Sequence, residues 1–327
     1  MSDQVLLTTT VGSFGKPDYL QKARNANARG KLGESELNEL ERKATEEWIR
    51  RQERLDLDIL VDGEMYRGDM VAYFAERLDG FKIGGLVRSY GNRYYHKPII
   101  ASKVARPKPM TVDWFRFTQS LTDRPVKGML TGPYTMLDWS YNEAYKTRRD
   151  AALALAEVVR QEAEDLQAAG ARYIQIDEPA IHARPEEIDI AIEAMGVVTQ
   201  NLDAKTISHI CYGDFAAIYP QVLDLPVDQL DLAMANYGYR WLDLFDRNPF
   251  TKELAIGIVD VHNHNTETVE EAAEGIRKGL RYVSAEKLWP HPDCGLKTRT
   301  IEESVEKCVA VVEATKIVRR ELAKVPA

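Results

Sequence analysis

Two residues that bind soft metal ions stand two positions apart near the middle of the sequence. His209 and Cys211 lie in the stretch ISHICYG, whose pattern is typical of a β-strand running out into a loop. Residues i and i+2 of a strand point to the same face, so both side chains would face one site. Two ligands cannot close a tetrahedral zinc site. The pair therefore predicts a metal site that is completed from elsewhere in the chain.

The remaining cysteines offer one further ligand. Cys294 lies in the stretch PHPDCGL, which also reads as a strand leaving into a loop. Cys308 lies in the apolar helical stretch VEKCVAVV, where a buried structural cysteine is expected. His291 could add a ligand, but the prolines on both sides of it favour a role in shaping the loop. Zinc sites are commonly assembled from Cys and His on separate elements, so we predict that His209, Cys211 and Cys294 bind Zn²⁺.

Further polar and aromatic residues follow predicted strands. Glu64 ends the run ILVDGE and Asp177 ends the run YIQID. An unpaired carboxylate is costly beside apolar strands, which favours groups turned toward a polar ligand over groups paired for structure. Trp139 follows the third predicted strand, where it either packs in the core or offers a flat face to a heteroaromatic ligand. Ser13 and His262 stand at the ends of two more strands.

The elements that position these residues alternate regularly. Short apolar or β-branched runs alternate with amphipathic helical stretches, and the runs cover residues 5–14, 59–65, 126–136, 173–177, 205–212, 229–236, 253–261 and 288–294. Helical crossovers imply parallel strands, and eight such units make a closed barrel. An open doubly wound sheet fits less well, because no Gly-x-Gly-x-x-Gly turn follows the first strand. We predict an α/β fold, a (β/α)8 TIM barrel, as a single domain over residues 1–327.

One region departs from this alternation. Residues 80–125 read as an excursion inserted into the barrel, and its segment RSYGNRYYHKPII is expected to be extended chain or a hairpin. The barrel interpretation places functional residues at the carboxyl ends of strands, and the residues selected above stand there.

Composition excludes several classes of partner. The net charge is −8 with no basic cluster, so no nucleic-acid surface is expected. No apolar run approaches the roughly 20 residues of a membrane span, and the first residues do not resemble a signal peptide. Three cysteines do not make a disulfide framework in a chain of 327 residues. A cytoplasmic protein with reduced thiols is expected.

Taken together, these motifs resemble the catalytic C-terminal barrel of cobalamin-independent methionine synthase. The matching stretches run from one end of the chain to the other: TTTVGSF (8–14), DGE (62–64), LTGP (130–133), IDEPA (176–180), DVH (260–262) and CGLKTR (294–299). Long members of the family carry a second, N-terminal barrel. No counterpart of that barrel is expected in this sequence, which is therefore similar to the short core type. Some members of that type are thought to take the methyl group from a corrinoid protein or another donor instead of a folate.

The resemblance implies a methyltransferase that moves a methyl group to the thiol of L-homocysteine to give methionine. It implies that the predicted zinc ligands hold the metal and that Ser13, Glu64 and Asp177 bind the amino-acid end of homocysteine. It places His262 near the reacting centre and Trp139 where long members stack the pterin. The methyl donor is expected to be methyltetrahydrofolate or a methyl-corrinoid protein.

One position departs from the family pattern. Ala233 aligns with a glutamate that usually supplies a further zinc ligand, so the metal would have three protein ligands and an open position, or weaker binding, or the site has another use. Two alternatives to methionine formation follow. One is alkylation of another thiol, as in relatives that open epoxides with coenzyme M; the other is a non-catalytic barrel that serves as a binding subunit.

Overall fold

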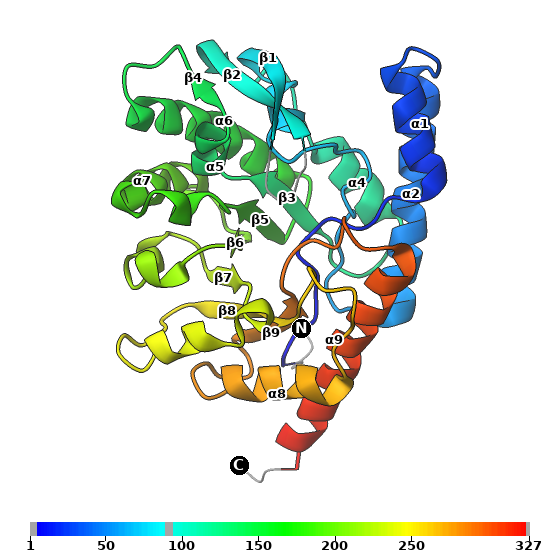
Figure 1. Cartoon of the computed structure of the whole chain (residues 1–327), viewed down its shortest axis with the longest axis vertical. Coiled ribbons are helices and arrows are strands. Elements are labelled where there is room, and N and C mark those ends of the chain that lie inside the picture. The colour runs from blue at the N-terminus through cyan, green and yellow to red at the C-terminus, as the bar shows by residue number, and fades with distance from the viewer. Residues whose placement is uncertain (1–4, 89–93, 325–327) are drawn as a thin grey trace. The chain divides into compact units, whose positions relative to one another are not determined.

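The core of the protein is a parallel sheet, seen in a computed structural model that describes residues 5–88 and 94–324. Its strands follow one another in the order β3 (Lys127–Thr131), β5 (Tyr173–Asp177), β6 (Lys205–Ile210), β7 (Gln229–Leu232), β8 (Glu253–Val259) and β9 (Leu288–Pro292) (Figure 1). Parallel pairing sets Tyr173 opposite Lys205 and Leu254 opposite Leu288. These strands are almost wholly buried, as parallel strands covered on both faces must be.

Two extended segments complete the ring. The first two predicted strands pair only through isolated parallel bridges in the described chain, Ser13 with Gly63 and Leu60 with Val126. Backbone hydrogen bonds add to these bridges: Thr9 N–H donates to the carbonyl of Pro290 on β9 (3.4 Å). The two segments thus connect β9 to β3, and the predicted (β/α)8 barrel is confirmed.

The described chain divides into two compact units. Among the described residues, the first contains 5–66, 117–127 and 230–324. Its helices are α1 (Asp18–Ala28), α2 (Glu34–Leu55), α8 (Val269–Gly279) and α9 (Ile301–Leu322). Helix α9 packs against both α8 and α2. Reciprocal hydrogen bonds cap the starts of α8 and α9, from Thr268 with Glu271 and from Thr300 with Glu303.

The second unit contains Arg67–Arg116 and Gly128–Gln229. Its helices are α3 (Ala72–Ala75), α5 (Pro133–Asp138), α6 (Arg148–Ala168) and α7 (Ile188–Thr199), while α4 (Val112–Ser120) begins in this unit and ends in the first. Strands β1 (Asp79–Arg88) and β2 (Tyr94–Ala105) form an antiparallel hairpin, and β4 (Tyr141–Asn142) pairs with β2. The expected excursion is therefore a small sheet, although residues 89–93 of its predicted segment lie outside the described part.

Several predicted boundaries are wrong. The third predicted strand stops at Thr131, because Gly132 caps α5 and Pro133 begins it. The sixth stops at Leu232 and a short 3-10 helix follows at Ala235–Tyr237. None of the helices described is long and apolar enough to cross a membrane.

A single carboxylate joins the first strand segment to the last helix. Asp58 Oδ2 accepts hydrogen bonds from Thr8 N–H and Thr8 Oγ1 (both 2.8 Å) and from Arg319 Nη2 (2.7 Å). Arg319 also donates to the carbonyls of Val5 and Leu6 (both 3.0 Å). These bonds attach the beginning of the segment that ends at Ser13 to helix α9.

Replacing Asp58 tests this attachment. Asp58→Ala should lower the free energy of unfolding by about 2–3 kcal/mol, because it removes several hydrogen bonds, one of them charge-assisted. Urea denaturation measures the change. Asp123→Ala, at an exposed loop position, should change stability by less than about 0.5 kcal/mol; equal stability of the two variants would contradict the account.

Candidate metal centre and substrate site

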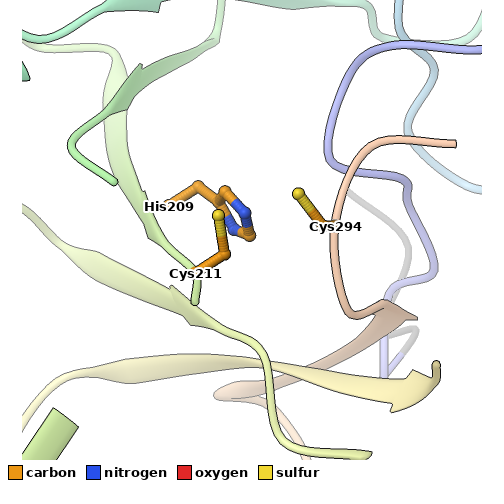
Figure 2. A group of neighbouring side chains, drawn as sticks. All are labelled: His209, Cys211 and Cys294. Atoms are coloured by element: carbon orange, nitrogen blue, oxygen red, sulfur yellow. The ribbon is translucent and has the colours of Figure 1, made fainter. Parts of the chain in front are cut away.

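His209 and Cys211 occupy the carboxyl end of β6. His209 is 2% exposed and Cys211 is 8% exposed, the latter one residue beyond the last strand residue, Ile210. Figure 2 shows both side chains on the same side of this strand end, as the spacing predicted. The backbone turns directly afterwards, because Tyr212 has a φ of 48°.

The main chain at this strand end is held by the loop after β5. Glu178 N–H donates to the carbonyl of His209 (3.0 Å), and the Nε2 atom of His182 lies 3.0 Å from the carbonyl oxygen of Cys211. Sequence reasoning did not select His182, because nothing near it in the chain marks a loop residue that contacts another strand end. These contacts fix the backbone from which both predicted ligands extend.

Glu178 has a buried carboxylate that points to α5. It accepts hydrogen bonds from Tyr134 N–H (3.0 Å), Thr135 N–H (2.7 Å) and Thr135 Oγ1 (2.7 Å). An added Cβ at Gly132 would lie 2.2 Å from its carboxyl carbon, so the close approach requires glycine there. Burial raises the pKa of Glu178 to about 7, although the hydrogen bonds oppose that rise.

Cys294 stands two residues beyond the end of β9, on a loop fixed by Asp293. The fully buried Asp293 carboxylate accepts backbone hydrogen bonds from residues 234–236, at 2.8, 2.9 and 2.6 Å. A Cβ at Gly257 would lie 2.0 Å from Asp293 Oδ1. Burial also raises the pKa of Asp293 to about 7. The loop that carries Cys294 is therefore tied to the turn after β7.

One ligand atom from each of His209, Cys211 and Cys294 lies within 4.8 Å of the other two (Figure 2). In a tetrahedral zinc site such nitrogen and sulfur atoms stand about 3.6–3.8 Å apart, which lies within this limit. Cys308 is fully buried on α9, and burial raises the pKa of its thiol to about 12. It is the structural cysteine that the sequence predicted.

The end of β7 offers a different arrangement from the family pattern. Ala233 follows the strand and is buried. Asp231 is fully buried on β7, and its Oδ1 lies 3.2 Å from Nε2 of His291. His291 belongs to β9 itself, so the interpretation of it as a loop-shaping residue is wrong.

Ser13 and Glu64 lie on neighbouring loops of the first unit. The carbonyl of Ser13 accepts the Leu296 N–H (2.6 Å), and Phe14 N–H donates to the carbonyl of Gly63 (3.1 Å). Glu64 has a φ of 56°, and its N–H is held by Asp62 Oδ1 (2.8 Å). We call the loops 13–16, 62–64 and 294–297 the three-loop platform.

The remaining predicted site residues lie at the end of β5, after α5 and after β8. Asp177 ends β5, is 8% exposed, and accepts a hydrogen bond from Gln175 Nε2 (2.7 Å). Trp139 follows α5 and is half-buried. His262 is exposed after β8, where its N–H donates to Asp260 Oδ1 (2.8 Å). Their roles in substrate binding and catalysis stay predictions.

Comparison with known proteins gives a consistent result over almost the whole chain. Residues 6–317 match the family described as "Cobalamin-independent synthase, Catalytic domain". The chain is 42% identical over 320 residues to a methionine synthase from Saccharolobus solfataricus, covering 97% of this chain and 96% of that protein. It is 40% identical over 327 residues to a methionine synthase from Sulfolobus acidocaldarius, covering 99% and 96%.

A solved structure is similar as well. It is a B12-independent methionine synthase from Shewanella sp. W3-18-1 in complex with selenomethionine. The similarity has a TM-score of 0.86 at 28% sequence identity and covers 98% of this chain and all of that one (100%).

Removing the Asp293 carboxylate should loosen the Cys294 loop. Asp293→Ala leaves backbone N–H groups without their acceptor and should lower the free energy of unfolding by about 2–4 kcal/mol. In metal-free protein, iodoacetamide should alkylate Cys294 several-fold faster than in wild type, as followed by mass spectrometry. Asp123→Ala is the control; an unchanged Cys294 rate in a folded Asp293→Ala variant would refute the positioning role.

Glu178 should give stability a pH dependence. Its pKa is about 7 in the folded protein, against an ordinary value of 4.5 in the unfolded chain. Between these values the folded state holds a proton that the unfolded state has lost, so this stabilisation is complete below 4.5 and disappears as the pH rises through 7. The stability of wild type relative to Glu178→Gln should fall by roughly 3 kcal/mol from pH 4.5 to pH 8.

Urea denaturation of metal-free protein at several pH values measures this difference. Glu306→Gln, an exposed change on α9, should show no such trend relative to wild type. A flat difference for Glu178→Gln would mean that the pKa of Glu178 is the same in the folded and unfolded states, which would contradict the effect of burial.

Proposed function

Because the chain belongs to the cobalamin-independent methionine synthase family, we propose that this methyltransferase moves a methyl group to the thiol of L-homocysteine to give methionine. The observation that carries the proposal is the group of His209, Cys211 and Cys294 ligand atoms. The similar Shewanella structure contains selenomethionine, an analogue of the proposed product. The relatives from Saccharolobus solfataricus and Sulfolobus acidocaldarius are both named methionine synthase, which favours methionine formation over alkylation of another thiol.

We propose that Zn²⁺ is the metal that these residues hold. Two thiolates and one imidazole are a donor set that zinc prefers, and three protein ligands leave a position open, as in other catalytic zinc sites. Bound zinc would supply a positive charge that deprotonates the substrate thiol, whose pKa in water is about 8.5. Two cysteinates and a neutral imidazole balance the charge of the ion, so the substrate sulfur would keep nucleophilic character.

The chain's own residues would hold the rest of the substrate. Glu64 and Asp177 offer carboxylates for the α-ammonium group of homocysteine, and Ser13 offers a hydroxyl. Fixing the amino-acid end determines where the sulfur lies, and methyl transfer requires the sulfur about 3–3.5 Å from the methyl carbon. In this proposal Ser13, Glu64 and Asp177 orient the substrate. The metal that the three ligand residues would hold activates its thiol.

Two donors fit the proposal, methyltetrahydrofolate and a methyl-corrinoid protein. Trp139 is half-buried, and its indole ring could stack on a pterin. We propose that His262 lies near the methyl group during transfer, since it follows a barrel strand at the end where such sites form. Parallel assays with methyltetrahydrofolate and methylcobalamin, each with L-homocysteine, would identify the donor.

Exchange of the ligand residues tests the proposal. Cys211→Ser and Cys294→Ser should each lower zinc affinity and the rate of methionine formation by about 100-fold or more, because a neutral hydroxyl replaces a thiolate ligand. Metal content after dialysis and methionine release are the measurements. Cys308→Ala is the matched control and should keep both; full activity in either serine variant would exclude thiol activation at this site.

A further inference from the structure

Lys16 is a cation built into the three-loop platform. It follows the Ser13 loop, is half-buried, and its Nζ donates to the backbone carbonyl of Glu64 at 3.0 Å. Glu64 has a positive φ, so this bond holds the carbonyl of a strained turn. The side chain of Lys16 therefore ends beside the residue expected to bind the substrate's amino group.

The surroundings of Lys16 leave its charge poorly compensated. The charged groups that face it are Arg24, Glu41, Glu64 and Lys297, from α1, α2 and the platform. Arg24 is already paired with Glu41 at 2.5 Å. Burial, Arg24 and Lys297 together lower the pKa of Lys16 to about 8, against the opposing effect of the two glutamates. Across residues 5–88 and 94–324, no ion pair within 4.0 Å includes Lys16.

An anion would satisfy this group. A lysine ammonium has three hydrogen-bond donors, of which the Glu64 carbonyl takes one. A ligand carboxylate could accept from the others through a charge-assisted bond, the strong type of hydrogen bond. The Glu64 carboxylate next to it has the opposite sign. An α-amino acid carries a carboxylate and an ammonium on one carbon, so the two residues together match its two charges.

We propose that Lys16 binds the α-carboxylate of the amino-acid thiol while Glu64 binds its α-ammonium, so that Lys16 makes the site selective for thiols that carry a carboxylate. This inference rests on the proposed function and names a substrate-binding residue that the family resemblance did not supply. Lys297 is a weaker choice for this role, because it is exposed and its charge is screened by water.

Three thiols separate this role from a structural one. Zinc-loaded wild type and Lys16→Met are titrated by calorimetry with L-homocysteine, with 4-sulfanylbutanoate, which lacks the amino group, and with 3-aminopropane-1-thiol, which lacks the carboxylate. Lys16→Met should bind the first two about 10- to 100-fold more weakly, because it loses a charge-assisted bond. It should bind the aminothiol within about 2-fold of wild type.

Two further variants sharpen the result. Lys16→Arg keeps the charge and should restore most of the affinity for L-homocysteine. Lys22→Met removes the same charge from an exposed position on α1 and should leave all three affinities unchanged. Equal weakening of all three thiols by Lys16→Met would mean that Lys16 only holds the Glu64 turn, and would overturn this inference alone. Failure of wild type to bind L-homocysteine would overturn the proposed function and this inference with it.

Discussion

Metal coordination by side chains from separate strands requires that each ligand be held close to its final position, within about 0.5 Å, before the ion arrives. In this protein the necessary restraint acts on the main chain. The carbonyl of His209 accepts the Glu178 N–H, and the carbonyl of Cys211 contacts His182. Asp293 accepts backbone hydrogen bonds from residues 234–236 and so holds the loop that carries Cys294. Everything proposed about thiol chemistry depends on these main-chain bonds.

The restraints made by Glu178 and Asp293 are built in the same way. Glu178 follows Asp177, and Asp293 precedes Cys294, so a structural carboxylate stands beside a predicted functional residue in both places. Each carboxylate is fully buried, accepts three hydrogen bonds, and packs against a glycine that has no room for a Cβ. Burying a carboxylate is costly, but three good donors offset most of that cost and fix the loop in one conformation.

Periodicity was sufficient to predict the barrel, and residue type with spacing was sufficient to predict that His209, Cys211 and Cys294 come together. The strand Tyr173–Asp177 lies where the sequence predicted it, because its local apolar pattern determines it. Strands β3 and β7 end earlier than predicted. The backbone that follows β3 is hydrogen-bonded by Glu178, and the backbone that follows β7 by Asp293, both from far along the chain. No local pattern reveals such bonds, nor the pairing of His291 with Asp231.

The central claim is that one metal ion is bound by one nitrogen and two sulfurs of this chain. X-ray absorption at the zinc edge of the reconstituted protein measures this directly. The account predicts two sulfurs at about 2.3 Å and a histidine nitrogen at about 2.0–2.1 Å, with a third sulfur on addition of L-homocysteine. A shell of nitrogen and oxygen alone, unchanged by the thiol, would contradict it.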